Sequence, residues 1–179
     1  LASLVRPPRA WRLAARLIEY LQGRGDGLSA DQIAGLWRDD CDVEAVGASV
    51  RSGLDANEAV LVSHLDSLDM DSYAAARHAG LAPLDAVTLH LSGVDLGVVS
   101  AVLQFGGDRG SAMEASAVGV REIEYRICRD VGIPHADITR LYTEGVSLWQ
   151  AARDQRRTRG YGDDAYDWFL RRQALAASA

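Results

Sequence analysis

The 179-residue chain contains no lysine, so all nineteen of its basic residues are arginine. It has only two cysteines, two phenylalanines and four prolines. No apolar run approaches the length of about eighteen residues that a membrane span requires. Little proline and phenylalanine with abundant alanine, leucine and valine favours helices over strands. The exclusive use of arginine, together with so much alanine, is typical of a GC-rich coding sequence and indicates a bacterial or phage source.

The two cysteines, Cys41 and Cys128, show no metal-ligand spacing. Cys41 occupies a position that is valine in equivalent segments, so we expect it to be a small buried hydrophobe. We expect no disulfide between the two thiols. No secretory signal is visible, although the chain starts at Leu1, and a reducing cytoplasm is the expected location.

No catalytic motif is present. The four histidines form no metal-binding pair, and no serine lies in a nucleophile-elbow sequence. Asp66, Asp69 and Asp71 lie close to His64, a spacing that suggests a divalent cation, but Asp69 is equally explained as a helix cap. The glycine-rich stretch 105–111 follows a helical segment and lacks the lysine of a phosphate loop. We therefore expect no catalytic residue, no metal and no cofactor.

A repeat of 26 or 27 residues organises the chain. Five units begin at glycines that lie 26 or 27 residues apart: Gly27, Gly53, Gly80, Gly106 and Gly132. Positions seven and ten of each unit are apolar, which predicts a short helix with one buried stripe. Such short helices are marginal alone and must pack against their neighbours. The period predicts an all-α solenoid, right- or left-handed, of about five helix hairpins.

Helix-start and turn residues recur in register with this period. Ser29 and Asp55 have capping-box spacing to the residues three positions later, and Pro83 and Pro134 fit a first helical turn. The middle turn of each unit carries Gly93, Gly119, Gly145, Asp40 or Asp66, residues that tolerate the backbone of a helix end. Asp42, Asp95 and Ser147 are then expected to cap the second helices, and the second helix of unit two is expected to be shifted by one residue.

The segments outside the repeats are predicted to cap the array. We divide the chain into a lead-in with a capping helix (1–26), the repeats (27–158) and a C-terminal capping helix with a frayed tail (159–179). The first helix, 10–22, has one apolar side made of Trp11, Ala14, Leu17, Ile18 and Leu21. Arginines line its other side, so an anionic membrane surface is an alternative to capping. The last helix, which Asp163 can cap, carries Tyr166, Trp168, Phe169 and Leu170.

Solenoids bind partners along extended faces, and two rows of residues are candidates. Position twenty-five of the units holds a polar ladder: Arg51, Arg77, Gln104, Asp130 and Arg156. Position eleven holds Trp37, Ser63, His90, Ser116 and Tyr142. Residues 25–150 carry a net charge of −12, whereas residues 1–24 carry +4 and residues 151–179 carry +2. An acidic middle argues against binding of phosphate backbones along the repeats, and the basic ends suit an acidic protein or another copy of the chain.

The opening Gly27-Leu-Ser-Ala-Asp-Gln-Ile33 resembles the start of a TAL-effector repeat, a two-helix unit that reads DNA. The likeness covers about seven residues. The units here are shorter, and the loop residues, Asp39-Asp40 and Glu144-Gly145 among them, are not basic. The leading hypothesis is a non-enzymatic repeat module that binds another protein or assembles with itself. A nucleic-acid-binding repeat protein is the alternative that the resemblance implies, and an enzyme with a site built across repeats is a third.

Overall fold

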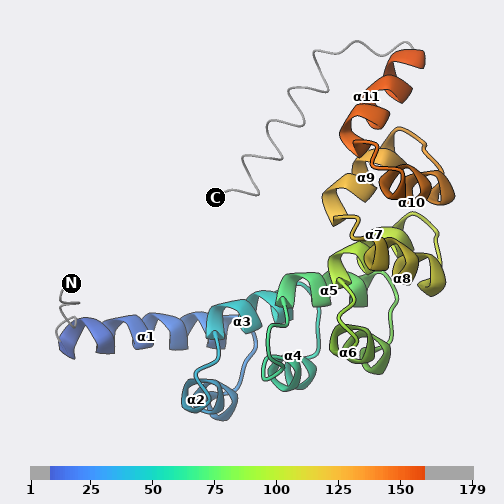
Figure 1. Cartoon of the computed structure of the whole chain (residues 1–179). Helices are drawn as coiled ribbons and strands as arrows, with labels where there is room; N and C mark the ends of the chain where they lie inside the picture. The colour runs from blue at the N-terminus through green and yellow to red at the C-terminus, as the bar shows by residue number, and fades with distance from the viewer. Residues whose placement is uncertain (1–8, 160–179) are drawn as a thin grey trace, which may run out of the picture. The chain divides into compact units, whose positions relative to one another are not determined.

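A computed structural model describes residues 9–159, which form eleven α-helices and no strand, so the all-α prediction is confirmed for this range. Most helices have seven to eleven residues, and α1 has seventeen. In chain order they are α1 (Arg9–Gly25), α2 (Ala30–Arg38), α3 (Val43–Arg51), α4 (Ala56–Val62), α5 (Met70–His78), α6 (Pro83–Leu91), α7 (Leu96–Gln104), α8 (Arg109–Val118), α9 (Glu122–Asp130), α10 (His135–Thr143) and α11 (Leu148–Thr158) (Figure 1). The predicted C-terminal capping helix and its Asp163 lie outside the described residues.

The chain divides into two compact units, Leu1–His90 and Leu91–Ala179. The division falls inside the third predicted repeat, at the end of α6, and the sequence did not anticipate it. The boundaries proposed from the sequence, between residues 26 and 27 and between 158 and 159, stay predictions.

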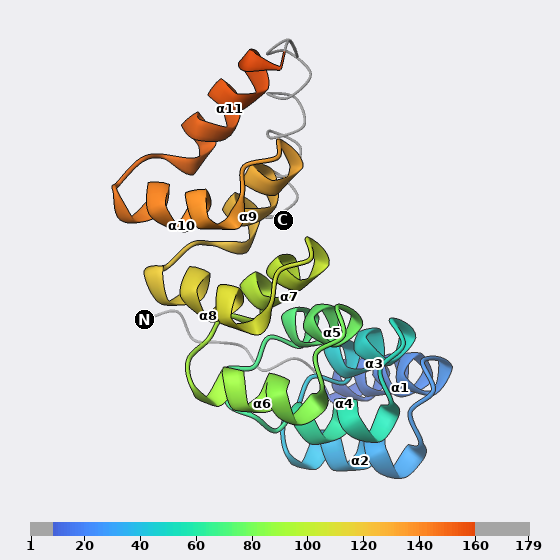
Figure 2. The ribbon, with the colours of Figure 1, turned by 90° about the vertical axis from the view of Figure 1, so that its right-hand side faces the viewer.

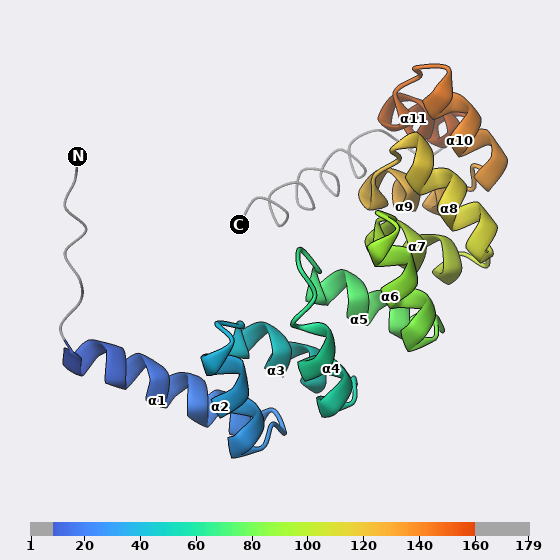
Figure 3. The ribbon, with the colours of Figure 1, turned by 60° about the horizontal axis from the view of Figure 1, so that its bottom comes forward.

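Within each unit, helices contact their close neighbours in the chain. In the first unit α1 packs on α2 and α3, and α3 packs on α4 and α5. Figures 1 and 3 show α1, α3 and α5 in one row, with α2 and α4 in another row beside it. In the second unit α7 packs on α8 and α9, and α9 packs on α10 and α11, as can be followed in Figure 2. Contacts between residues close in sequence dominate both units.

Helix starts follow the predicted cap chemistry. Ser29 and Gln32 form a reciprocal capping box at α2. Asp42, Asp95 and Ser147 accept hydrogen bonds from backbone N–H groups of α3, α7 and α11, as predicted. Asp55 caps α4 in the same way. Its expected capping-box partner, Glu58, is bound to other side chains instead, as described below.

Prolines and the middle turns show two differences from prediction. Pro83 is the first residue of α6, as expected, whereas Pro134 precedes α10 as its cap residue. Gly93, Gly119 and Gly145 have left-handed backbone, and Asp40 adopts it at φ 57°. In unit two this conformation falls on Ser67 (φ 60°) and not on Asp66. Seven residues separate α4 from α5, against four between α2 and α3, and α5 starts one position later in its unit, as predicted.

The predicted buried stripe is present on the first helices. Positions seven and ten are both buried in four units, and position seven is buried in the fifth. The buried residues are Ile33, Leu36, Ala59, Val62, Ala86, Leu89, Ala112, Ala115 and Ile138. Only Leu141 is half-buried. The second helices add larger side chains to the core, among them the fully buried Tyr73 and Tyr125.

Candidate functional site

The polar ladder at position twenty-five is engaged in contacts within the fold, and its first member shows the pattern. Arg51, at the end of α3, forms an ion pair with Asp26, which follows α1. The side chain of Asp26 is only 8% exposed, and its carboxylate lies over Gly47 of α3, where any side chain would collide with it. Arg51 therefore ties the end of α3 to the end of α1.

Arg77 belongs to a half-buried cluster between α4 and α5. Its Nε lies 2.6 Å from Oε1 of Glu58, and the hydroxyl of Tyr73 donates to the same oxygen at 2.8 Å. Burial alone would raise the pKa of Glu58, but the hydrogen bonds from Arg77 and Tyr73 outweigh it and hold that pKa below its usual value. Burial and the hydrogen bond to Glu58 raise the pKa of Tyr73. The cluster joins the two helices of one hairpin.

Arg77 has two structural equivalents. It donates through Nη1 to the carbonyl of Leu81, four residues later. Arg24 donates in the same way to Leu28 at 3.1 Å, and Arg129 donates to Ile133 at 3.0 Å. Each of these arginines precedes a repeat glycine by three residues, whereas Arg51 and Gln104 precede theirs by two. The 27-residue unit thus moves Arg77 out of line with the rest of the ladder.

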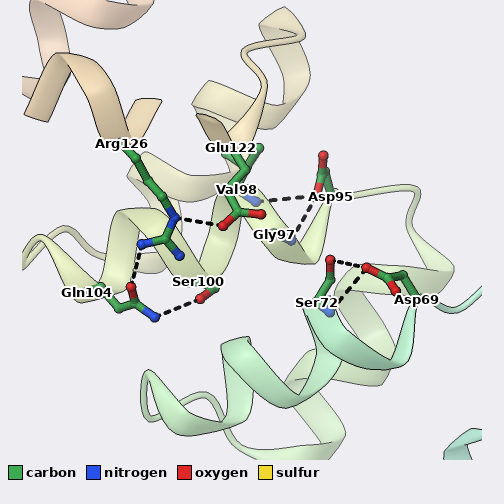
Figure 4. Close-up of polar contacts among 9 residues, drawn as sticks. All are labelled: Asp69, Ser72, Asp95, Gly97, Val98, Ser100, Gln104, Glu122 and Arg126. Carbon is green, nitrogen blue, oxygen red and sulfur yellow. Dashed lines mark hydrogen bonds and ion pairs between the residues drawn. The ribbon is translucent and has the colours of Figure 1, made fainter. Parts of the chain in front are cut away.

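Gln104 connects α7 to α9. Its Oε1 accepts from Nη1 of Arg126 at 2.6 Å, and its Nε2 donates to Oγ of Ser100 at 3.1 Å. Arg126 also donates from Nε to Oε1 of Glu122 at 2.7 Å, and Figure 4 shows the resulting chain of contacts across the two helices. A side chain at Gly97 would lie 2.6 Å from Oε2 of Glu122, so this carboxylate packs directly on α7.

The last two ladder residues lie together at α9 and α11. Asp130, Val131, Arg156 and Arg159 line a pocket of about 180 Å³. Burial raises the pKa of Asp130, and Arg126 opposes this shift. The guanidinium of Arg159 lies directly on Gly132. Arg156 is half-buried.

The row at position eleven also makes contacts inside the fold, with the helix or turn that precedes it. Trp37 donates from Nε1 to Glu19 of α1 at 2.9 Å, and His90 Nε2 lies 3.0 Å from the carbonyl of Asp66. The other members do the same. Ser63 accepts from Cys41 through its carbonyl at 3.7 Å, Ser116 accepts from the backbone of Asp95 at 3.0 Å, and Tyr142 lies on Gly119. The row at position eleven, together with Arg51, Arg77 and Gln104 of the ladder, therefore joins neighbouring segments, and binding of a partner by either row stays a prediction.

Cys41 is half-exposed, so the prediction that it is buried was wrong. Its Sγ lies 3.4 Å from Nδ1 of His64, and Nε2 of His64 lies 4.0 Å from Asp39. The thiol therefore lies beside the polar side chain of His64, which follows α4, and stays partly accessible to solvent. Cys128 is buried, and burial raises its pKa to about 12. Neither cysteine is in a disulfide.

In the cluster of acidic residues near His64, Asp69 serves as a helix cap. Asp69 accepts hydrogen bonds from the backbone N–H and the hydroxyl of Ser72 at the start of α5 (Figure 4). Asp42 and Asp69, both caps, line the shallow hollow of about 440 Å³ between α3 and α5. Over residues 9–159, no three His, Cys, Asp or Glu side chains are placed to hold a metal.

Helix α1 carries more exposed large apolar side chains than any other described helix. Five of its large side chains are more than half exposed: Trp11 (74%), Leu13 (64%), Leu17 (58%), Ile18 (57%) and Leu21 (60%). The predicted stripe thus faces away from the first repeat and does not bury itself as a cap would. Elsewhere, Leu61 on α4, Leu84 and Leu91 on α6, and Met113 on α8 are exposed.

The opposite side of α1 packs on the first repeat. Gly23 is buried, and a Cβ atom there would lie 3.0 Å from Cδ1 of Ile33 and 3.1 Å from Cγ1 of Val43. The guanidinium of Arg16 lies 5.4 Å from the centre of the Trp37 ring, and the ring of Tyr20 lies 6.3 Å from it. A glycine and polar residues make the contact, and within residues 9–159 the apolar stripe stays exposed.

One signal in the sequence would have identified α1 as an equivalent of the second helices. Leu17 precedes Gly27 by ten residues, as Val43, Met70 and Leu96 precede Gly53, Gly80 and Gly106. Those three residues are 3%, 8% and 4% exposed, whereas Leu17 is 58% exposed. The C-terminal half of α1 is therefore the counterpart of the second helices, and its exposed side corresponds to the side that they bury.

No helix within residues 9–159 has the length and apolar character needed to cross a bilayer. No protein-family model, no curated protein and no solved structure matches the chain.

Proposed function

We propose that the chain is a non-enzymatic α-solenoid of five helix hairpins that binds another protein through the exposed apolar side of α1. The observation that carries the proposal is the exposure of five large apolar side chains on one side of a single helix. Monomeric proteins rarely expose contiguous apolar surface of more than a few hundred Å², and larger patches mark interaction sites.

The recurrence of the same backbone conformation and the same buried positions supports the solenoid. Glycines with left-handed backbone end the second helices at Gly53, Gly80 and Gly106, and the buried residue ten positions before each of them is apolar. A solenoid buries the apolar sides of its helices against neighbouring helices. The described residues leave the apolar side of α1 exposed, which supports a partner on that side.

The polar clusters support a structural role over a catalytic one. Glu58, Arg77 and Tyr73 satisfy one another, as do Gln104, Arg126 and Glu122, and each set joins two helices. A catalytic group needs a free side to meet a substrate. The charge distribution likewise supports a protein partner over nucleic acid, because residues 25–90 carry twelve acids and three arginines.

The test compares recovery of binding partners from the native host by three tagged forms of the chain. We expect the wild type to retain a defined protein set, the double variant Leu17→Glu/Leu21→Glu to lose it, and Leu84→Glu to keep it. Leu84 is the matched control because it is 77% exposed on α6. Equal recovery by all three forms would rule out the α1 surface. Salt-sensitive binding of the wild type to duplex or single-stranded DNA or RNA would favour the nucleic-acid alternative.

A further inference from the structure

We propose that Cys41 is a redox modification site, at which His64 takes up the thiol proton and a hydroperoxide oxidises the sulfur. The product, a sulfenic acid, then condenses with a low-molecular-weight thiol to a mixed disulfide. Three observations carry this inference. They are the contact between a thiol and an imidazole from successive repeats, the carboxylate on the far side of that imidazole, and the partial exposure of all three groups.

The thiol and the imidazole come from the turns that follow two first helices. Cys41 lies three residues after the end of α2, and His64 lies two residues after the end of α4. These two helices are neighbours in one row (Figures 1 and 3). Sγ of Cys41 lies 3.4 Å from Nδ1 of His64, and Nε2 of the same ring lies 4.0 Å from the carboxylate of Asp39. The arrangement is that of a nucleophile, a base and a group that orients the base.

The repeat register shows that the fold does not need this pair. At the position of the thiol, unit three has Val94 and unit four has Val120. At the position of the imidazole, the units that follow these have Ala117 and Thr143. The same turns are thus built elsewhere without a thiol and without a base. A thiol and an imidazole in contact therefore add chemistry to the first two units that the later units lack.

Charge makes His64 the group on which reactivity depends. Cys41 is flanked in sequence by Asp39, Asp40 and Asp42, and nearby negative charge opposes formation of a thiolate. A free cysteine is only a few per cent thiolate at neutral pH. Transfer of the proton to Nδ1 of His64 places an imidazolium beside the thiolate, and an adjacent imidazolium favours the thiolate. The carboxylate of Asp39 stabilises that imidazolium and so acts as a positioning residue.

The oxidation balances as a two-electron step. The thiolate attacks one oxygen of hydrogen peroxide, so that an S–O bond forms and the O–O bond breaks. The departing hydroxide takes the proton from His64 and leaves as water. Sulfur is oxidised by two electrons and the peroxide is reduced. The carbonyl oxygens of Asp39 and Ser63, each 3.7 Å from Sγ, are placed to accept the hydrogen bond of the new S–OH group.

The second step needs a thiol from outside the chain. Cys128 is the only other cysteine, and it is fully buried. Cys41 is half-exposed and the side chain of His64 is 38% exposed, so a small thiol can reach the sulfur. The sulfur of that thiol attacks the sulfenic sulfur, an S–S bond forms, and the S–OH oxygen leaves as water with the proton of the incoming thiol.

The first experiment measures how fast hydrogen peroxide oxidises the native full chain, with dimedone to trap the sulfenic acid and mass spectrometry of the peptides to quantify it. Cys41 of the wild type should react roughly tenfold faster than Cys41 of His64→Ala, because without the base only a few per cent of the thiol is ionised. Asp39→Asn should give a smaller loss of rate. In urea the wild type and His64→Ala should react at the same rate, since unfolding separates the thiol from the imidazole.

The matched control is Val94→Cys in a Cys41→Ser background. This thiol occupies the same turn position and is also half-buried, but Ala117 stands at the position of the imidazole. It should react as slowly as Cys41 of His64→Ala. The second experiment adds reduced glutathione with the peroxide, which should convert Cys41 to the glutathione disulfide and leave Cys128 unmodified. Dithiothreitol should reverse the modification.

Three results would overturn the site. Equal rates for the wild type and His64→Ala in the native state would exclude His64 as the proton acceptor. A Val94→Cys thiol as fast as Cys41 would mean that exposure alone sets the rate. Sulfinic acid, or a disulfide between two copies of the chain, in place of the glutathione adduct would exclude the mixed disulfide. If circular dichroism shows that His64→Ala loses helix content, His64→Gln gives the same comparison with a side chain of similar size.

Discussion

Arg77 and Glu58 form a charge pair that is largely shielded from solvent: Nε and Oε1 lie 2.6 Å apart, and the side chains are 23% and 18% exposed. The pair joins α5 to α4 and recruits the hydroxyl of Tyr73. Replacing Glu58 with glutamine would keep one acceptor oxygen, but it would remove the counter-charge of the guanidinium and put an NH2 donor where Arg77 now meets the second oxygen. The cost is therefore one of unsatisfied groups in addition to a lost attraction.

We predict that Glu58→Gln lowers the free energy of unfolding by about 1–3 kcal/mol. Urea denaturation followed by circular dichroism measures it. Glu144→Gln is the control, because Glu144 pairs with Arg140 at a site where both side chains are about half exposed (52% and 56%). Exposed pairs contribute about 0.5 kcal/mol. If the two variants lost equal stability, the Glu58 cluster would contribute no more to the free energy of unfolding than an exposed ion pair does.

The same carboxylate predicts how stability depends on pH. The pKa of Glu58 is lower in the folded protein than its ordinary value of 4.5, so its contribution is fully present above pH 4.5. That contribution is lost as the pH falls from 4.5 through the folded-state pKa. Glu124 acts in the same direction, because the hydrogen bond from Arg121 lowers its pKa against the effect of burial. Unfolding free energies measured below pH 4.5 should fall more steeply for the wild type than for Glu58→Gln.

Alanine substitutions at two glycines that are close in sequence should change the stability of the protein in opposite directions. A Cβ atom at Gly107 would lie 2.5 Å from Cγ1 and 3.0 Å from the carbonyl oxygen of the buried Val102, so Gly107→Ala should destabilise by about 1–3 kcal/mol. At Gly110, in the first turn of α8, the nearest atom is 3.4 Å away. Gly110→Ala should stabilise by about 0.5–1 kcal/mol, because alanine favours helix. Thermal and urea denaturation of both variants checks this, and loss of stability in Gly110→Ala would contradict it.

Two of the middle turns allow serine and glycine to be exchanged at equivalent positions, and the two substitutions should change stability in opposite directions. Ser67 and Gly145 occupy equivalent left-handed positions, with φ of 60° and 75°. A side chain costs about 1–2 kcal/mol in this conformation. Ser67→Gly should therefore stabilise by about 1 kcal/mol or less after the entropy of glycine is subtracted, and Gly145→Ser should destabilise by about 1 kcal/mol. Nothing lies within 4 Å of a Cβ atom at Gly145, so steric collision does not contribute to its change.

The two thiols should differ in reactivity. Cys41 is half-exposed, whereas Cys128 is fully buried with a pKa raised to about 12. Iodoacetamide at neutral pH should label Cys41 in the native protein and label Cys128 only after denaturation. Mass spectrometry of the peptides reports both sites. Native labelling of Cys128 at the rate of Cys41 would mean that the region around α9 opens readily.

The helical class and the cap residues were predictable, because each depends on residues within a few positions of one another. Asp42 caps α3 through backbone groups two and three residues away, and Ser29 and Gln32 complete a box within one turn. The buried positions of the first helices followed from their spacing in the same way. The prediction failed at Ser67 because one added residue changed which position needed the left-handed backbone.

The sequence alone determined that α1 is a helix with one apolar side, since that follows from the order of its residues. Only the tertiary structure decided that this side faces outward, because Gly23 on the opposite side of α1 packs on Ile33 and Val43 of the first repeat. The same holds for the two polar rows. Their spacing was visible in the sequence, but the partners that satisfy Arg51, Gln104 and His90 come from helices and turns about 24 residues away, and only folding brings them within hydrogen-bond distance.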